Sequence, residues 1–142
     1  MKRALLILSL LVLASCATAQ RYFSYPGGWP DADVNVGGYR YQLWFHPVDR
    51  TIWMERGDPR PMSEAAALNV TRYASDRTQP DAIWRAAADA VLNPIACHVT
   101  QVRGQDQARE ASYQCGPGVD LDTAIEANRE RWRQGIEAPL PG

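Results

Sequence analysis

The sequence predicts a small α+β domain with two antiparallel β-hairpins, two or three helices and one disulfide bond. Three observations lead to this fold class. Residues 95–115 alternate apolar and polar side chains on both sides of a central turn, as a half-buried hairpin does. Residues 39–56 repeat the pattern around a turn at 46–50. Two later stretches space their apolar residues at the interval of an amphipathic helix.

The length and charge of the chain exclude several classes of function. Its 142 residues suffice for one domain with one core. Without Lys2 and Arg3, 13 basic side chains face 16 acidic ones, a net charge of −3. Nucleic-acid binders carry the opposite balance, so no nucleic-acid partner is expected. Because Lys2 is the only lysine, Walker-type phosphate loops and Schiff-base chemistry are excluded.

Residues 1–15 are predicted to be an export signal. Lys2 and Arg3 precede an apolar run of 11 residues. A membrane-spanning helix needs about 20 apolar residues, so this run is too short to remain in the bilayer.

Two cleavage sites are compatible with this signal. The letters L-A-S-C at 13–16 resemble the lipobox of bacterial lipoprotein precursors. The resemblance implies that Cys16 is lipidated and becomes the mature N-terminus. It also implies, through Ala17 after the cysteine, sorting to the outer membrane with the domain on the periplasmic side. The letters A-T-A at 17–19 instead fit ordinary signal peptidase, which would leave a soluble periplasmic protein.

Residues 16–38 are predicted to form a lipid-anchor tether, because glycine, proline, aspartate and aromatic residues crowd this stretch. Tyr22, Tyr25 and Trp29 are expected to press onto the domain. D-A-D-V-N at 31–35 has the spacing that opens an EF-hand calcium loop. The glycine comes one place late, however, and position twelve is not a glutamate. A turn-rich linker is the better interpretation, and no metal site is expected.

The globular domain is predicted to span 39–136 and to begin with a hairpin. Pairing Phe45 with Ile52 and Leu43 with Met54 gives this hairpin one apolar face.

The other face of the first hairpin holds the candidate binding surface. Trp44 is expected opposite Trp53 among polar neighbours, with His46 beside the pair. Two tryptophans on a wet face are typical of a docking surface. The alternative is that a helix or the tether covers both rings.

Residues 63–75 fit a helix and a strand equally and stay unassigned. A helix is expected from 80 to 93, because proline is favoured in a first turn and N-P ends the pattern. Arg85 and Asp89 are expected on its solvated side. Its predicted apolar stripe is Ile83, Trp84, Ala87, Ala88 and Val91.

The second hairpin, folded about Asp106, places two cysteines opposite each other. Directly opposite residues have Cβ atoms about 4.5–5.5 Å apart, so a disulfide needs only a small shift. Removal or lipidation of Cys16 leaves Cys97 and Cys115 as an even pair in an oxidising compartment. The expected register is Cys97–Cys115, Val99–Tyr113 and Gln101–Ala111.

The last helix is expected to begin after Asp120, a favoured N-cap, and to end at Gly135. The arginines at 129, 131 and 133 are expected on a solvated face. Residues 137–142 are expected to be disordered. The predicted buried stripe is Leu121, Ala124, Ile125, Asn128 and Trp132.

No catalytic residue and no cofactor are expected. His98 follows Cys97 directly, so on a strand the two side chains point to opposite faces and form no nucleophile pair. Neither His98 nor His46 has the spacing of a zinc site.

The sequence therefore predicts a non-catalytic lipoprotein of the bacterial cell envelope, a binding or assembly accessory. Its partner is an envelope protein or ligand that the sequence does not identify, and its lipid anchor places it at the membrane. The alternative is a small periplasmic inhibitor or ligand-binding module released by signal peptidase. An envelope hydrolase ranks third.

Overall fold

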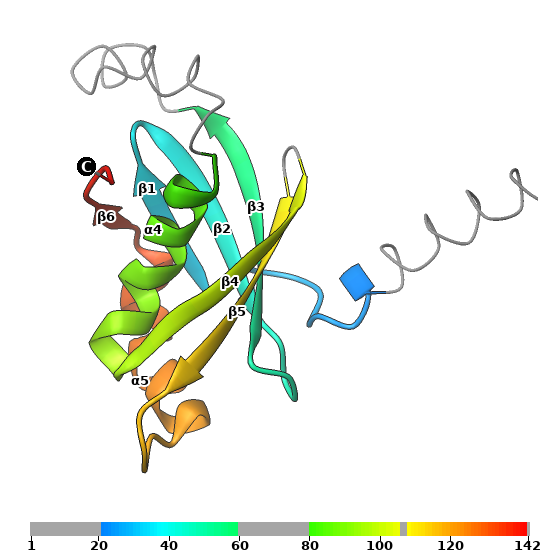
Figure 1. The fold of residues 1–142 in the computed structure, drawn as a ribbon, viewed down its shortest axis with the longest axis vertical. Coiled ribbons are helices and arrows are strands. Elements are labelled where there is room, and N and C mark those ends of the chain that lie inside the picture. The colour runs from blue at the N-terminus through cyan, green and yellow to red at the C-terminus, as the bar shows by residue number, and fades with distance from the viewer. Residues whose placement is uncertain (1–20, 60–79, 106–107, 142) are drawn as a thin grey trace, which may run out of the picture.

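The computed structural model describes residues 21–59, 80–105 and 108–141. These residues form a small α+β domain in which two helices lie on one face of a curled, six-stranded mixed sheet (Figure 1). The elements, in chain order, are β1 (Ala32–Val36), β2 (Tyr39–Phe45), β3 (Thr51–Pro59), α4 (Pro80–Leu92), the 3₁₀ turn η2 (Asn93–Ile95), β4 (Cys97–Gln105), β5 (Ala108–Cys115), α5 (Leu121–Arg133) and β6 (Ile136–Ala138).

The strand order in the sheet is β4-β5-β3-β2-β1-β6. β1 and β6 are parallel, whereas the other neighbouring strands are antiparallel. Phe45 lies opposite Ile52, Leu43 opposite Met54 and Trp44 opposite Trp53. Alternation along the strands therefore turns the aliphatic residues of β2 and β3 to one face of the sheet and both tryptophans to the other.

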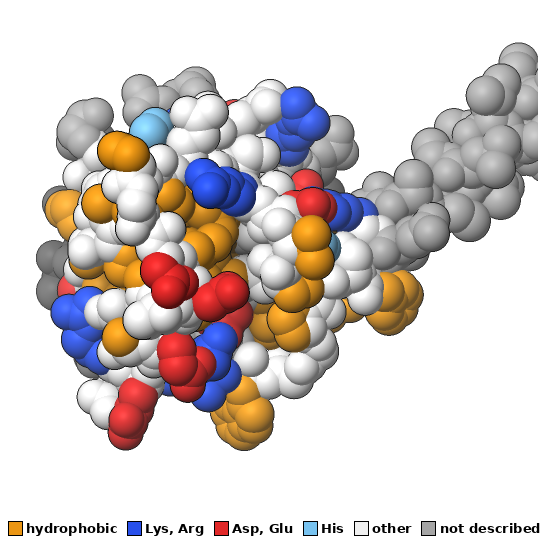
Figure 2. Space-filling model, turned by 90° about the horizontal axis from the view of Figure 1, so that it is seen from below, with side chains coloured by type: hydrophobic (Ala, Val, Ile, Leu, Met, Phe, Trp, Pro, Cys, Tyr) orange, Lys and Arg blue, Asp and Glu red, His pale blue; other side chains and the backbone are white. Residues whose placement is uncertain are grey.

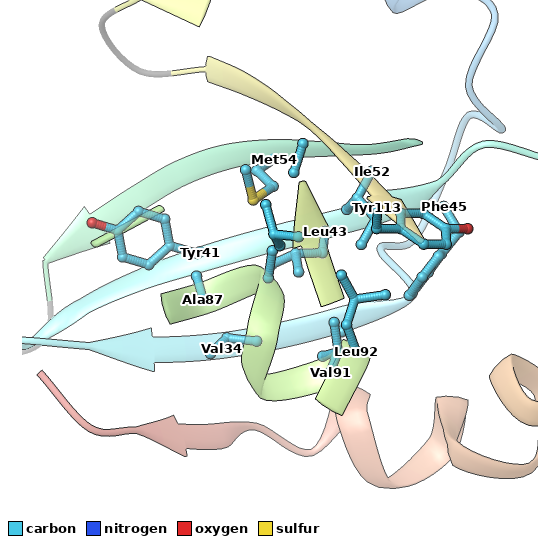
Figure 3. Packing of buried hydrophobic residues seen from close by; sticks show 14 of the residues in the cluster. Val34, Tyr41, Leu43, Phe45, Ile52, Met54, Ala87, Val91, Leu92 and Tyr113 are labelled. Atoms are coloured by element: carbon cyan, nitrogen blue, oxygen red, sulfur yellow. The ribbon is translucent and has the colours of Figure 1, made fainter. Parts of the chain in front are cut away.

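The core lies between the aliphatic face of the sheet and the two helices. Figure 3 shows Leu43 and Met54 of the sheet turned toward the same interior as Leu92 of α4. Phe45 stacks on Trp132 of α5 with ring centroids 5.8 Å apart, and so ties the second helix to the same core. Each large side chain that is fully buried in this way stabilises the fold by about 1.5–3 kcal/mol.

Helix α4 begins and ends close to the expected limits. Arg85 and Asp89, which are expected on the solvated side of the helix, instead bind the edge strand β4. Arg85 Nη1 donates to Val99 O at 2.7 Å, and Val99 N donates to Asp89 Oδ1 at 3.1 Å. Both outward backbone groups of Val99 are thereby occupied. An edge strand otherwise offers such groups to another chain, so the two side chains protect this edge.

Strands β4 and β5 are linked by the disulfide between Cys97 and Cys115, which confirms the predicted bond. The expected register is wrong beyond Val99, because the register shifts by one residue at Thr100. Gln101 therefore lies opposite Ser112 and not opposite Ala111. A bulge of this kind inserts one unpaired residue, and alternation in the sequence does not reveal it.

Residues 32–36 are predicted to belong to the tether. In the structure they form β1 inside the sheet, and all five are buried. The polar residues of this strand have partners. Arg40 donates to both carboxylate oxygens of Asp33, each at 2.7 Å. Gly37 and Gly38, both with positive φ, turn the chain tightly into β2. The domain therefore begins before residue 39.

The segment after α5 also belongs to the domain, in contrast to the predicted disordered tail. Residues 136–138 pair with β1 as β6. Leu140 packs on the core, and a Cβ on Gly37 would lie only 2.7 Å from Leu140 Cδ2. Gly37 therefore leaves the space that the C-terminal segment fills.

Two other predictions fall outside the described residues: the export signal with Cys16, and the unassigned stretch at 63–75. Among the helices that the structure describes, none combines the length and the apolar character required to cross a membrane.

The disulfide closes a loop of 18 residues, so its loss is expected to lower the free energy of unfolding by about 2–5 kcal/mol. Urea denaturation of a Cys97→Ala/Cys115→Ala double variant measures this loss. In the unmodified protein, both thiols should react with an alkylating agent only after reduction. Reaction before reduction would contradict the bond.

Candidate functional site

Residues 21–31, here called the strap, run across the face of the sheet opposite the helices (Figure 1). The strap therefore covers one part of this face, over β2, β3 and β5, whereas His98 of β4 and Gln114 of β5 stay exposed. The strap begins with Arg21 and ends with Asp31, and these two residues fix its two ends.

Arg21 fastens the first end of the strap with three side-chain bonds. Its Nε donates to Glu110 Oε1 at 2.7 Å and its Nη1 to Asp49 Oδ2 at 2.7 Å. Its Nη2 donates to Thr51 Oγ1 at 3.0 Å. The bond from Arg21 lowers the pKa of Asp49 below its ordinary value. Exposed ion pairs are individually weak, but one guanidinium that binds three groups positions the segment well.

Tyr25 fastens the middle of the strap. Tyr25 is buried, with only 7 % of the residue exposed. Its hydroxyl is hydrogen-bonded to the Glu110 carboxylate and, at 2.7 Å, to Thr51 Oγ1. Burial, together with the bond to Glu110, raises the pKa of Tyr25.

Trp44 and Trp53 lie beneath the strap and are half-buried, which is intermediate between the two predicted alternatives. Tyr22 and Tyr25 contact the Trp53 ring, with centroids 5.4 and 5.9 Å away. Trp53 Nε1 donates to Glu55 Oε1 at 2.9 Å. Trp44 Nε1 instead donates to the Gly28 carbonyl at 3.3 Å. Trp53 therefore contacts the strap through its ring, and Trp44 through its indole N–H.

His46 organises the turn between β2 and β3. Its Nδ1 accepts from Val48 N at 3.2 Å and from Asp49 N at 2.8 Å, so this nitrogen carries no proton. Its Nε2 then carries the proton and donates to Ser24 Oγ of the strap, 3.1 Å away. With both ring nitrogens engaged, His46 serves as a positioning residue.

An open groove of about 1220 Å³, here called the strap groove, lies between the strap, the β2–β3 turn and α5. Its lining combines aromatic, acidic and basic side chains. The residues that define it are Trp29, Asp31, Trp44, His46, Arg129 and Arg133.

Helix α5 forms one wall of the strap groove. Asp120 caps the helix as predicted, because its carboxylate accepts from Thr123 N at 3.2 Å. Arg129 and Arg133 are expected on a solvated face. In the structure, both side chains instead bind the strap. Arg133 Nε donates to the Pro30 carbonyl at 2.8 Å. Arg129 Nε donates to Asp31 Oδ1 at 2.9 Å, and Arg129 also pairs with Glu126.

Asp31 is the buried acidic group of the groove, with 8 % of the residue exposed. Its second oxygen, Oδ2, accepts from the backbone N of Phe45 at 2.9 Å. One carboxylate thus joins the strap, the end of β2 and helix α5.

Trp29 is 85 % exposed, in contrast to the expectation that it presses onto the domain. Of the three aromatic residues expected to do so, Tyr25 is buried and Tyr22 is 44 % exposed. In the part of the chain that the structure describes, the Trp29 ring contacts no other aromatic ring. It stands in the groove with most of its surface available.

The structure brings together only part of the predicted binding surface. Trp44 and His46 line the strap groove, whereas Trp53 does not. The contacts of Asp31, Arg129 and Arg133 are not predicted from the sequence. The two arginines of α5 bind the strap, about 100 residues earlier in the chain. The local sequence around Asp31 gives no signal for this contact, because the residue precedes β1 and its partner Arg129 lies 98 residues away.

Among the residues that the structure describes, no group of three or more histidine, cysteine, aspartate or glutamate side chains could hold a metal ion. Comparison with protein-family models, with curated proteins and with solved structures finds no match to this chain.

Replacement of Tyr25 by phenylalanine is expected to lower the free energy of unfolding by about 1–2 kcal/mol, because Glu110 and Thr51 each lose a buried partner. Tyr22→Phe is the matched control and should change it by less than about 0.5 kcal/mol. Urea denaturation of the two variants measures both effects. Equal effects would contradict the role given to the Tyr25 hydroxyl.

The contribution of Tyr25 to the free energy of unfolding is expected to depend on pH. Because the native pKa of Tyr25 is raised, the native state keeps the proton above pH ~10, where the unfolded chain releases it. The stabilisation is complete below pH ~10 and is lost as the pH rises further. Wild-type stability should therefore fall more steeply above pH ~10 than that of Tyr25→Phe.

Proposed function

We propose that this protein is a non-catalytic, lipid-anchored binding protein of the bacterial cell envelope, and that the strap groove is its binding site. The observation that carries the proposal is the Trp29 ring, 85 % exposed in an open groove whose other walls are fixed by hydrogen bonds. An exposed tryptophan on a rigid concave surface is typical of a recognition site.

The charged groups of the groove support binding more than catalysis. Asp31 is occupied by Arg129 and by a backbone N–H, and His46 uses both ring nitrogens to hold the turn and the strap. Groups held in this way shape a surface and set its polarity. A general acid or base needs an unengaged proton-transfer site within reach of a substrate.

The position of the strap determines which face of the domain a lipid anchor would hold near the membrane. Cys16 precedes Arg21 by five residues, so at most about 18 Å of extended chain separates the two Cα atoms. Arg21 is fixed to β3 and β5 through Thr51 and Glu110. A lipid on Cys16 would therefore hold the strap face of the domain close to the membrane surface.

The disulfide supports an extracytoplasmic compartment. A bond between Cys97 and Cys115 persists in the oxidising periplasm and is rare in the reducing cytoplasm. The same bond suits the alternative, a soluble periplasmic inhibitor or ligand-binding module, which would have the same groove without the anchor.

The mature N-terminus tests this proposal. Mass spectrometry of the protein taken from cell envelopes should find a diacylated or triacylated Cys16, since two or more acyl chains give stable attachment. Cys16→Ala should leave the protein unprocessed or soluble. A mature N-terminus at Gln20 would contradict the lipoprotein and favour the soluble module.

A further inference from the structure

We propose that the strap groove binds a neutral saccharide chain, with Trp29 as the platform on which one sugar ring stacks. The proposal deepens the proposed function by naming the ligand class of the same groove. It depends on the groove itself and not on the lipid anchor.

Trp29 supplies the apolar part of the recognition. One face of a β-linked pyranose carries only C–H groups, and such a face packs flat against an aromatic ring. An indole suits this contact because it combines a large apolar surface with rigid geometry. Trp29 is 85 % exposed and contacts no other aromatic ring among the described residues, so its ring is available to a flat ligand.

The walls supply polar groups of both kinds that a hydroxyl-rich ligand needs. Glu126, whose side chain is 72 % exposed, offers acceptor oxygens. Arg133 binds Pro30 through Nε only, so among the described residues its two terminal nitrogens remain available as donors. A sugar hydroxyl both donates and accepts, and it can therefore bridge such donors and acceptors.

The charge of the groove favours a neutral ligand. Asp31, Asp122 and Glu126 line it together with Arg129 and Arg133. Two of the carboxylates are already paired with Arg129. Figure 2 shows the molecule from below, with acidic and basic side chains lying beside one another on this face. A strongly anionic polymer would require an excess of basic groups.

The size and openness of the groove favour a chain over a single small molecule. Its volume of about 1220 Å³ exceeds the roughly 300–1,000 Å³ of a typical small-ligand pocket. It is open to solvent between the strap, the β2–β3 turn and α5, so a ligand of several rings is not confined to an enclosed cavity.

A proline-rich peptide is the competing ligand for an aromatic groove. Domains that bind such peptides line their grooves with several aromatic rings that together form slots for the proline residues. Here Trp29 and Trp44 contact no other aromatic ring in the described part of the chain. The paired acidic and basic groups also suit hydroxyls better than an apolar peptide face.

Titration calorimetry of the mature, full-length protein in detergent tests the proposal, with chitotetraose and cellotetraose as probes and a proline-rich decapeptide as the competitor. At least one of the tetrasaccharides should bind, and Trp29→Ala should weaken its binding at least tenfold. Trp53→Phe is the matched control and should bind as the wild type does, because Trp53 lies outside the groove. Thermal melts should show Trp29→Ala folded, since the replaced ring is exposed.

Three results would overturn the proposal: no binding of either tetrasaccharide, binding that Trp29→Ala leaves unchanged, or binding of the decapeptide alone. These results are separate from the test of the anchor. A protein with Gln20 at its N-terminus could still bind a saccharide through Trp29, and a lipidated protein could fail to do so.

Discussion

The buried carboxylate of Asp31 is the constraint on which the functional face depends. It accepts from the backbone of Phe45 and from Arg129, and so joins the strap, β2 and helix α5. An ionised carboxylate that is buried without partners costs several kcal/mol, so loss of either contact is expected to destabilise the packing of these three segments. The strap groove is the space that remains between them once they are joined.

The path of the strap over part of the second face gives the two hairpin tryptophans different roles. Helices α4 and α5 cover one face, and the strap crosses the other. Trp53 lies under Tyr22 and Tyr25 and serves packing. Trp44 lies farther along the strap, where its indole N–H holds Gly28 and the rest of the side chain lines the groove. A binding surface on this face is therefore built from the strap as much as from the strands.

Features with local causes could be predicted from the sequence, whereas features with distant causes could not. The opposed cysteines, the Asp120 cap and the limits of α4 depend on neighbouring residues or on simple alternation. The polar Asp33 makes the sequence of β1 resemble a linker, because its partner Arg40 lies on the next strand. β6 is only three residues long, which is too short for a periodic signal. The pairing of Asp31 with Arg129 joins residues 98 positions apart, and residue spacing does not encode such a contact.

A double-mutant cycle of Asp31→Asn and Arg129→Gln tests most directly whether this contact holds the strap to α5. Urea denaturation of the wild type, the two single variants and the double variant gives the coupling free energy between the two side chains. We expect a coupling of about 1–3 kcal/mol, because the Asp31 carboxylate is buried and, among the described residues, is held by Arg129 and by the backbone N–H of Phe45. The Glu126→Gln and Arg129→Gln cycle is the control and should give less than about 1 kcal/mol, since Glu126 is exposed. Single-variant effects at Asp31 and Arg129 that add to within about 0.5 kcal/mol would contradict the account.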